Sequence, residues 1–213
     1  MKPKFEKQYY SNLFSWKELE YLINIRPLMT DQRVYLQGDE NHQWNSSGWA
    51  LDVSCYPPSL LKQLIEENLC YLRDMSRCSE KINTFNKSIE EEYKVPTDAH
   101  IYMCRNPSLH HPFGIHFDMN HNIIVQCEGE SNFKVWEHVR NKRIKNNNLS
   151  LDTNDFNPHP ILNVDMIPGD AIWIPAYHPH LATSKTSRMS VSFPIPPVIR
   201  DDVVFEDREW IKL

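Results

Sequence analysis

The sequence has no cysteine pattern of the kind that builds a disulfide framework or a zinc site. Its five cysteines are an odd number, and no two of them have CxxC spacing. No apolar run approaches the ~20 residues that a helix needs to cross a bilayer, and the first residues include no apolar core of signal-peptide length. We therefore expect a cytoplasmic protein that does not enter a membrane.

An excess of positive charge is also missing. The formal net charge is −5 and the pI is about 6.0, whereas a nucleic-acid surface needs a concentrated basic patch. The basic cluster from Arg140 to Lys145 lies beside three asparagines, and we interpret it as a solvated hairpin loop. We expect no nucleic-acid partner.

Internal repeats and low-complexity tracts are absent, and 213 residues suffice for one well-buried core. We expect a single domain over residues 1–213. Residues 1–95 would form a helix-rich support with some strands, 96–197 a strand-rich core, and 198–213 an acidic tail. The tail could pack on its own domain or on a second subunit, so the oligomeric state stays open.

The first half predicts three helices. A capping box followed by apolar residues at helical intervals predicts the first over residues 15–26, and Pro58 opens the second. We expect the third over residues 82–93 and extended structure over 33–55. Amphipathic helices of this kind usually cover a core. The apolar face of the second helix comprises Leu60, Leu61, Leu64, Ile65, Leu69 and Leu72.

The second half predicts β structure. After Pro96, short segments rich in Ile, Val, Phe and Trp are separated by Pro, Gly, Asn or Asp. Strands without helices between them pair antiparallel in barrels or sandwiches. We predict a mainly β fold, a double-stranded β-helix or jelly roll buttressed by N-terminal α-helices. The expected strands cover residues 99–105, 115–127, 132–138, 162–166, 170–175 and 188–195.

One triplet, His116-Phe117-Asp118, carries candidate chemistry. On a strand, residues i and i+2 point to the same face, so His116 and Asp118 would present an imidazole and a carboxylate together. His178 and His180 share strand parity, and either could supply a third ligand. Two histidines and one carboxylate leave positions free on an octahedral metal, which is how non-haem Fe(II) binds a co-substrate and O₂. The triplet therefore predicts an enzyme.

The neighbours of the triplet make it more specific. Asn122, Gln126 and Gly129 follow it, and the segment from Pro168 to Pro175 ends five residues before His180. Over residues 99–195 this combination resembles the JmjC/cupin-like branch of the 2-oxoglutarate- and Fe(II)-dependent oxygenases, especially its asparaginyl-hydroxylase-like members.

The resemblance implies a cupin-like jelly roll that holds Fe(II) through His116, Asp118 and His180. His180 is preferred to His178 because the histidine of the family lies five residues after a proline, here Pro175. It also implies 2-oxoglutarate as co-substrate and O₂-dependent hydroxylation of a protein side chain, an amino acid or another small molecule. The carboxylate of Asp118 argues against halogenation, because halogenating relatives have a small residue there.

The distal carboxylate of 2-oxoglutarate needs a cation, and here the sequence departs from the family. Relatives often use a lysine two or three residues after the glycine that matches Gly129, but serine and asparagine occupy those positions. Arg188 and Ser190 look like the Arg-x-Ser element of other 2-oxoglutarate oxygenases, and a guanidinium can bind a carboxylate bidentately. We favour Arg188. Lys134 is the rival, although strand alternation predicts that it faces solvent.

Other polar residues have weaker assignments. The resemblance implies that Asn122 binds the co-substrate carboxylate and that Ser192 adds a contact, and Tyr102 could donate its hydroxyl. Each could equally be satisfied by the fold itself. We expect core or surface roles, not metal ligation, for His110, His111, His121, His178, Trp44, Trp49 and Trp173.

Two other functions stay open. The chain could be a metal-binding cupin that oxidises nothing, acting as a sensor or scaffold. It could also be a metal-dependent isomerase or hydrolase on the same fold, with Zn²⁺ in place of iron. Formation of succinate that depends on iron and 2-oxoglutarate would separate both from an oxygenase.

Overall fold

The computed structural model describes residues 2–25, 34–37, 51–52, 57–107, 114–137 and 159–197. Several sequence features lie outside these residues. They are the basic segment 140–145, the tail 198–213, His110, His111, Trp44 and Trp49.

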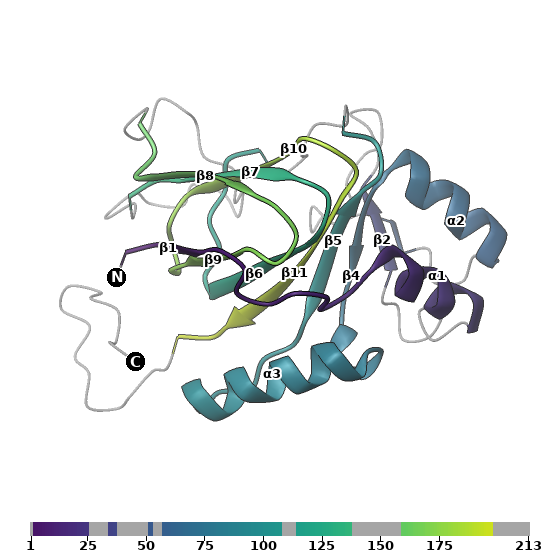
Figure 1. The fold of residues 1–213 in the computed structure, drawn as a ribbon, viewed down its shortest axis with the longest axis horizontal. Coiled ribbons are helices and arrows are strands. Elements are labelled where there is room, and N and C mark those ends of the chain that lie inside the picture. The colour runs from purple at the N-terminus through teal and green to yellow at the C-terminus, as the bar shows by residue number, and fades with distance from the viewer. Residues whose placement is uncertain are drawn as a thin grey trace.

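The described strands form two sheets, in which every strand pair is antiparallel. The eight-stranded sheet has the order β1 (Lys4–Glu6), β9 (Ala171–Ile174), β6 (His121–Glu128), β11 (Arg188–Ile195), β5 (His100–Cys104), β4 (Leu69–Leu72), β2 (Val34–Gln37) and β3 (Leu51–Asp52). The three-stranded sheet has the order β10 (His180–Ser184), β7 (Ser131–Val135) and β8 (Leu162–Met166). The small sheet lies over the β9, β6 and β11 part of the large one (Figure 1). This confirms the predicted mainly β jelly roll.

An apolar layer lies between the two sheets. Phe133 and Val135 of β7 and Ala182 of β10 belong to the same buried cluster as Ile124 of β6 and Ile172 of β9. Because strand side chains alternate between faces, each strand contributes every second residue to this layer. The layer holds the two sheets face to face.

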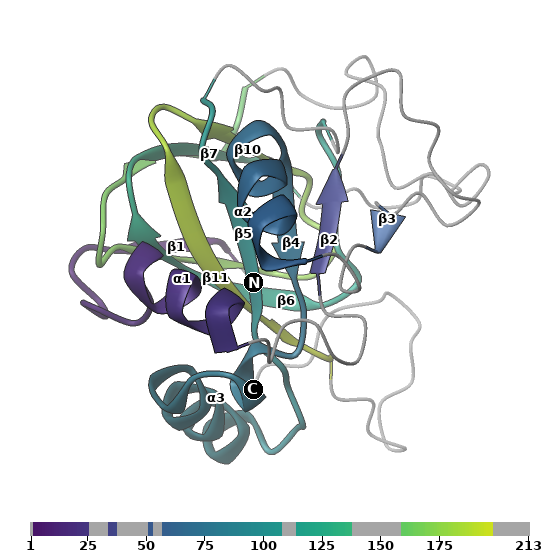
Figure 2. The same ribbon diagram turned by 90° about the vertical axis from the view of Figure 1, so that its right-hand side faces the viewer.

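The helices α1 (Trp16–Ile25), α2 (Pro58–Glu67) and α3 (Glu80–Tyr93) lie on the other face of the large sheet (Figure 2). A short 3-10 helix, η2 (Met75–Arg77), precedes α3. One bond of the predicted capping box is present, because the Glu18 amide donates to Ser15 Oγ at 3.3 Å; the Glu18 carboxylate accepts from the Ser15 hydroxyl at 2.7 Å. No helix among the described residues is long and apolar enough to cross a bilayer.

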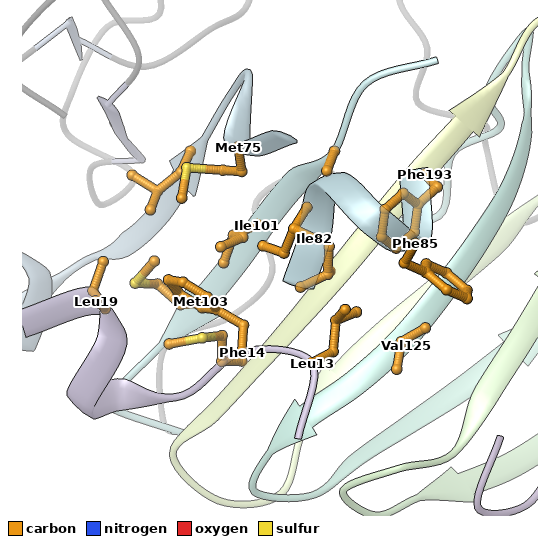
Figure 3. Close-up of a cluster of buried hydrophobic side chains, with 14 of the residues drawn as sticks. Leu13, Phe14, Leu19, Met75, Ile82, Phe85, Ile101, Met103, Val125 and Phe193 are labelled. Carbon is orange, nitrogen blue, oxygen red and sulfur yellow. The ribbon is translucent and has the colours of Figure 1, made fainter. Parts of the chain in front are cut away.

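The main hydrophobic core lies between the helices and the large sheet (Figure 3). Ile82 and Phe85 of α3 and Leu13 before α1 pack with Val125 of β6 and Phe193 of β11. The two faces of β11 therefore differ. Its odd-numbered residues from 189 to 195 are in this core, whereas Arg188, Ser190 and Ser192 point to the opposite side.

The predicted extension of the second helix to Leu72 is wrong. The helix ends at Glu67, Asn68 is extended at φ −130° and ψ 161°, and Leu69–Leu72 form β4, which pairs with β2 and β5. A run of apolar residues fits a buried helix or a buried strand equally well. The available β5 edge decides for a strand here, and all four residues of β4 are buried.

The start of one strand and the presence of two others also differ from the prediction. Residues 115–120 do not continue β6, and only His116 makes an isolated bridge, with His180. The strands β1 and β10 were not predicted, because both are short and contain polar residues. The bridge and β10 together position the candidate site.

Candidate metal centre

His116, Asp118 and His180 come together, with one ligand atom of each within 4.8 Å of the others. The bridge between the two histidines causes this, because the His116 amide donates to the His180 carbonyl at 3.2 Å and the reverse bond measures 2.7 Å. Their rings lie 4.4 Å apart, and His180 Nε2 is 3.7 Å from Asp118 Oδ2. His178, the alternative third ligand, is not part of the cluster.

Backbone carbonyls orient both imidazoles. His116 Nδ1 lies 3.2 Å from the Gly114 carbonyl, and His180 Nδ1 lies 3.0 Å from the His178 carbonyl. A carbonyl only accepts, so each Nδ1 carries the proton and each Nε2 presents a lone pair to a metal. Second contacts of this type fix the tautomer of metal-binding histidines.

The carboxylate is held in a similar way. Asn122 Nδ2 donates to Asp118 Oδ2 at 2.6 Å, and Ser192 Oγ donates to Asn122 Oδ1 at 3.2 Å. Asn122 thus supports Asp118, and it does not line the pocket described below. Burial lowers the pKa of His116 to about 4, with the neighbouring His180 adding to the effect and Asp118 opposing it. His116 is therefore neutral near pH 7, as metal ligation requires.

Tyr177 joins the two ligand-bearing segments and was not identified from the sequence. Its amide donates to the Asp118 carbonyl at 2.8 Å, and its ring stacks on Phe117 with centroids 5.7 Å apart. Its φ of 60° is in the left-handed region, which non-glycine residues adopt only at a cost. No residue pattern announces a left-handed tyrosine, so only the structure could reveal this link.

The three candidate ligands open into a pocket between the sheets. Its walls are polar on β11 and β5 and apolar on β6, β7 and β10. The pocket is lined by Tyr102, His116, Asp118, Ile124, Phe133, His180, Ala182, Arg188, Ser190 and Ser192.

Arg188 is the notable residue of this pocket, because it is a charged side chain only 1% exposed. Its Nε donates to Ser184 Oγ at 2.8 Å and its Nη1 to Ser190 Oγ at 3.3 Å. Burial lowers its pKa to about 10, with Cys104 opposing the shift, and no described carboxylate contributes. A buried charge paired only with neutral hydroxyls is costly. The pocket is thus suited to an anion beside Arg188.

Of the other polar residues that the sequence suggested for co-substrate binding, some line the pocket and others lie outside it. Tyr102, Ser190 and Ser192 line the pocket, whereas Lys134 alternates with pocket-lining Phe133 and so points to the other face of β7. Gln126 donates to the carbonyls of residues 128 and 129 and accepts from the Ser131 hydroxyl, so it fixes the turn between β6 and β7.

His121 and His178 hydrogen-bond to the backbone near the metal centre. His121 Nδ1 accepts from the Ala176 amide at 3.0 Å, and its ring stacks on Trp173. His178 Nδ1 lies 3.2 Å from the Ala176 carbonyl. Both side chains are buried and help to shape the loop that leads to His180.

The family model described as "JmjC domain" matches residues 74–199. No curated protein matches the chain significantly. Among solved structures, an X-ray structure of ycfD from Escherichia coli matches with 19% identity and a TM-score of 0.61, covering 92% of this chain and 50% of that one.

Two further structures of the same Escherichia coli protein, called a ribosomal oxygenase, contain ligands. The complex with cobalt and 2-oxoglutarate matches with 18% identity and a TM-score of 0.60, covering 93% of this chain and 49% of that one. The complex with cobalt and succinic acid matches with 16% identity and a TM-score of 0.57, with the same coverage of 93% and 49%. The chain thus spans about half the length of these proteins, and the likeness concerns the fold.

Proposed function

Because the chain belongs to the JmjC domain family, we propose that it is a 2-oxoglutarate-dependent non-haem Fe(II) dioxygenase that acts as a hydroxylase. The observation that carries the proposal is the placement of two complementary groups in one pocket. His116, Asp118 and His180 lie at one side, and a buried guanidinium without a carboxylate partner among the described residues lies at another.

The three ligands fit Fe(II). Two imidazoles with unprotonated Nε2 atoms and one carboxylate form the donor set of non-haem iron oxygenases. Asn122 holds the carboxylate, and the Gly114 and His178 carbonyls hold the rings. This support aligns the ligands before a metal arrives, so little ordering remains to be done on binding.

The polar wall fits a dicarboxylate. Arg188 would bind the distal carboxylate of 2-oxoglutarate, with Ser190 and Tyr102 as hydroxyl donors, while the oxo-acid end would reach the metal. Ser192 lies between this wall and Asn122. Lys134 faces away from the pocket, which favours Arg188 as the anchor.

When bound, iron and 2-oxoglutarate together supply the activation of O₂ that inserts one oxygen atom into a C–H bond and releases succinate and CO₂. The protein contributes position and exclusion of water. Ile124, Phe133 and Ala182 form an apolar wall beside the ligands. Such a wall keeps the reacting groups away from bulk solvent.

For the substrate we propose more than one class. The Escherichia coli protein of similar fold is called a ribosomal oxygenase and was solved with cobalt and 2-oxoglutarate, which supports a protein side chain as one candidate. An amino acid or another small molecule is the other. Membership of the asparaginyl-hydroxylase-like branch, a single domain, and a cytoplasmic location also stay predictions.

The test is turnover without a known substrate. Purified protein with Fe(II), 2-oxoglutarate and O₂ should form succinate slowly, and omission of any one component should stop it. A metal-binding sensor would form none, and a zinc isomerase would ignore 2-oxoglutarate and O₂. Once succinate is seen, a screen of peptides and amino acids for a mass gain of one oxygen would identify the substrate.

A further inference from the structure

The Arg188 guanidinium has two hydroxyl partners, and only one of them belongs to the pocket. Its Nη1 donates to Ser190 Oγ at 3.3 Å, and Ser190 lines the pocket. Its Nε donates to Ser184 Oγ at 2.8 Å, and Ser184 is not among the lining residues. The Nη1 side of the guanidinium is therefore turned to the pocket, and the Nε side is turned away from it.

Strand β10 determines where Ser184 lies. His180, Ala182 and Ser184 share one face of this strand, because residues two apart point to the same side. His180 is a candidate metal ligand and Ala182 lines the pocket. Ser184 lies four residues beyond His180, or about 13 Å along the strand. One strand thus carries a candidate metal ligand at its start and a partner of Arg188 at its end.

The hydrogen bond between Ser184 and Arg188 also joins the two sheets. Ser184 is the last residue of β10 in the small sheet, and Arg188 is the first residue of β11 in the large one. Residues 185–187 connect the two strands. The orientation of the guanidinium is therefore determined where the chain crosses from one sheet to the other.

A guanidinium can bind a carboxylate through two parallel hydrogen bonds along either of two edges. One edge is formed by Nε and Nη2, and the other by Nη1 and Nη2. Because Ser184 accepts the single proton of Nε, the first edge cannot bind a ligand bidentately. Nη1 carries two protons and gives only one to Ser190, so the second edge keeps a donor at both of its positions.

We infer that Ser184 is a positioning residue, which holds Nε of Arg188 and so presents the Nη1–Nη2 edge to the distal carboxylate of the co-substrate. The inference rests on the proposed function, because 2-oxoglutarate is the ligand that brings this carboxylate. A hydroxyl suits the task, since it orients the guanidinium without neutralising its charge. Without that hydroxyl, Nε has no partner among the described residues, and the carboxylate loses the fixed bidentate geometry.

The test compares two ligands of the Fe(II)-loaded protein by calorimetry without O₂. One is 2-oxoglutarate, and the other is 2-oxopentanoate, which has the same carbon chain and oxo-acid end but no distal carboxylate. In Ser184→Ala the Kd for 2-oxoglutarate should rise about tenfold, the scale of a hydrogen bond to a charged group. The Kd for 2-oxopentanoate should stay that of wild type. Ser184→Thr keeps the hydroxyl and should bind 2-oxoglutarate like wild type.

A double-mutant cycle tests whether Ser184 acts through Arg188. In an Arg188→Met background no Nε remains, so Ser184→Ala should cause no further rise in the Kd for 2-oxoglutarate. Thr183→Ala is the matched control, because it removes a hydroxyl from the neighbouring residue of β10, which is exposed and points to the other face. This control should bind both ligands like wild type.

The outcomes are distinguishable. Equal weakening of both ligands in Ser184→Ala, or the same loss in the Arg188→Met background, would show that Ser184 only supports the fold and would refute the inference. Unchanged binding of 2-oxoglutarate by Ser184→Ala would also refute it and leave the proposed function intact. A wild-type protein that does not bind 2-oxoglutarate would refute both. Ser184→Cys, whose sulfur is a weak acceptor, should show the same selective loss and serves if Ser184→Ala does not fold.

Discussion

Replacement of Arg188 by methionine should weaken co-substrate binding and stabilise the ligand-free protein at the same time. Methionine keeps much of the length of the side chain but removes its charge and its donors. The two effects have opposite signs because Arg188 has no carboxylate partner among the described residues, whereas 2-oxoglutarate would supply one.

The binding loss can be estimated from buried charge pairs. Removal of one partner of a buried, hydrogen-bonded pair costs about 2–5 kcal/mol. At about 1.4 kcal/mol per tenfold change, the Kd for 2-oxoglutarate should rise from roughly 30-fold to a few thousand-fold. Arg188→Lys should fall between wild type and Arg188→Met, because an ammonium keeps the charge but loses the bidentate geometry.

The stability change follows from desolvation. Arg188 is 1% exposed, and its guanidinium has only the Ser184 and Ser190 hydroxyls as described partners. Replacing buried ions by apolar groups of similar volume is often neutral or stabilising by about 1–4 kcal/mol. A gain of about 1 kcal/mol would raise Tm by about 2–4 °C in a chain of this size.

The assay is thermal unfolding with and without 2-oxoglutarate, together with calorimetric titration of the metal-loaded protein. Lys134→Met is the matched control, since Lys134 points away from the pocket, and it should change neither quantity. The reasoning is refuted if Arg188→Met binds 2-oxoglutarate like wild type, or if Lys134→Met has the binding defect instead. A large loss of stability in Arg188→Met would show that its hydrogen bonds to the serines outweigh its desolvation.

Three further predictions concern the ligands and the turns that support them. Asp118→Ala should abolish iron-dependent succinate formation and lower the bound iron measured by elemental analysis, while the circular dichroism spectrum stays that of wild type. Because the pKa of His116 is lowered to about 4, the unfolded chain binds its proton more readily below about pH 6.5. The free energy of unfolding of the metal-free protein should therefore fall from pH 6.5 towards 4, and less so in His116→Gln, as urea titrations would show. Gly129→Ala should lower the same free energy by at least about 2 kcal/mol, because φ is +64° and the new Cβ would lie 1.8 Å from the Ser187 carbonyl oxygen; an unchanged urea midpoint would contradict this.

The features that were predictable from the sequence are those with a period or a fixed spacing. β11 shows this, because its alternating residues separate the core from the pocket, and Arg188 and Ser190 fall on the pocket side as expected. The HxD spacing also brings His116 and Asp118 together, although His116 lies in an isolated bridge and not in a long strand. Local alternation is enough to bring residues two apart onto one face.

The features that escaped prediction depend on partners distant in the chain. Leu69–Leu72 read as the end of a helix and became a strand because β5 offers an edge to pair with. Tyr177 adopts a left-handed conformation that its own side chain disfavours, and the contact with Asp118 and Phe117 compensates. The contact between the Tyr71 hydroxyl and His100 Nδ1 was not predicted either, because neither residue belongs to a motif and the contact joins two strands.

The metal ligands and the polar wall of the pocket are therefore held in place by different kinds of contact. The ligands are aligned by backbone bonds, namely the bridge between His116 and His180 and the Tyr177 amide on Asp118, so their geometry survives most side-chain changes nearby. The polar wall of the pocket depends on side chains alone, since Arg188, Tyr102 and Ser190 are held by hydroxyls and neighbouring rings. Substitutions in the wall should thus change the affinity for 2-oxoglutarate while iron still binds, whereas changes in the bridge segments should remove iron and turnover together.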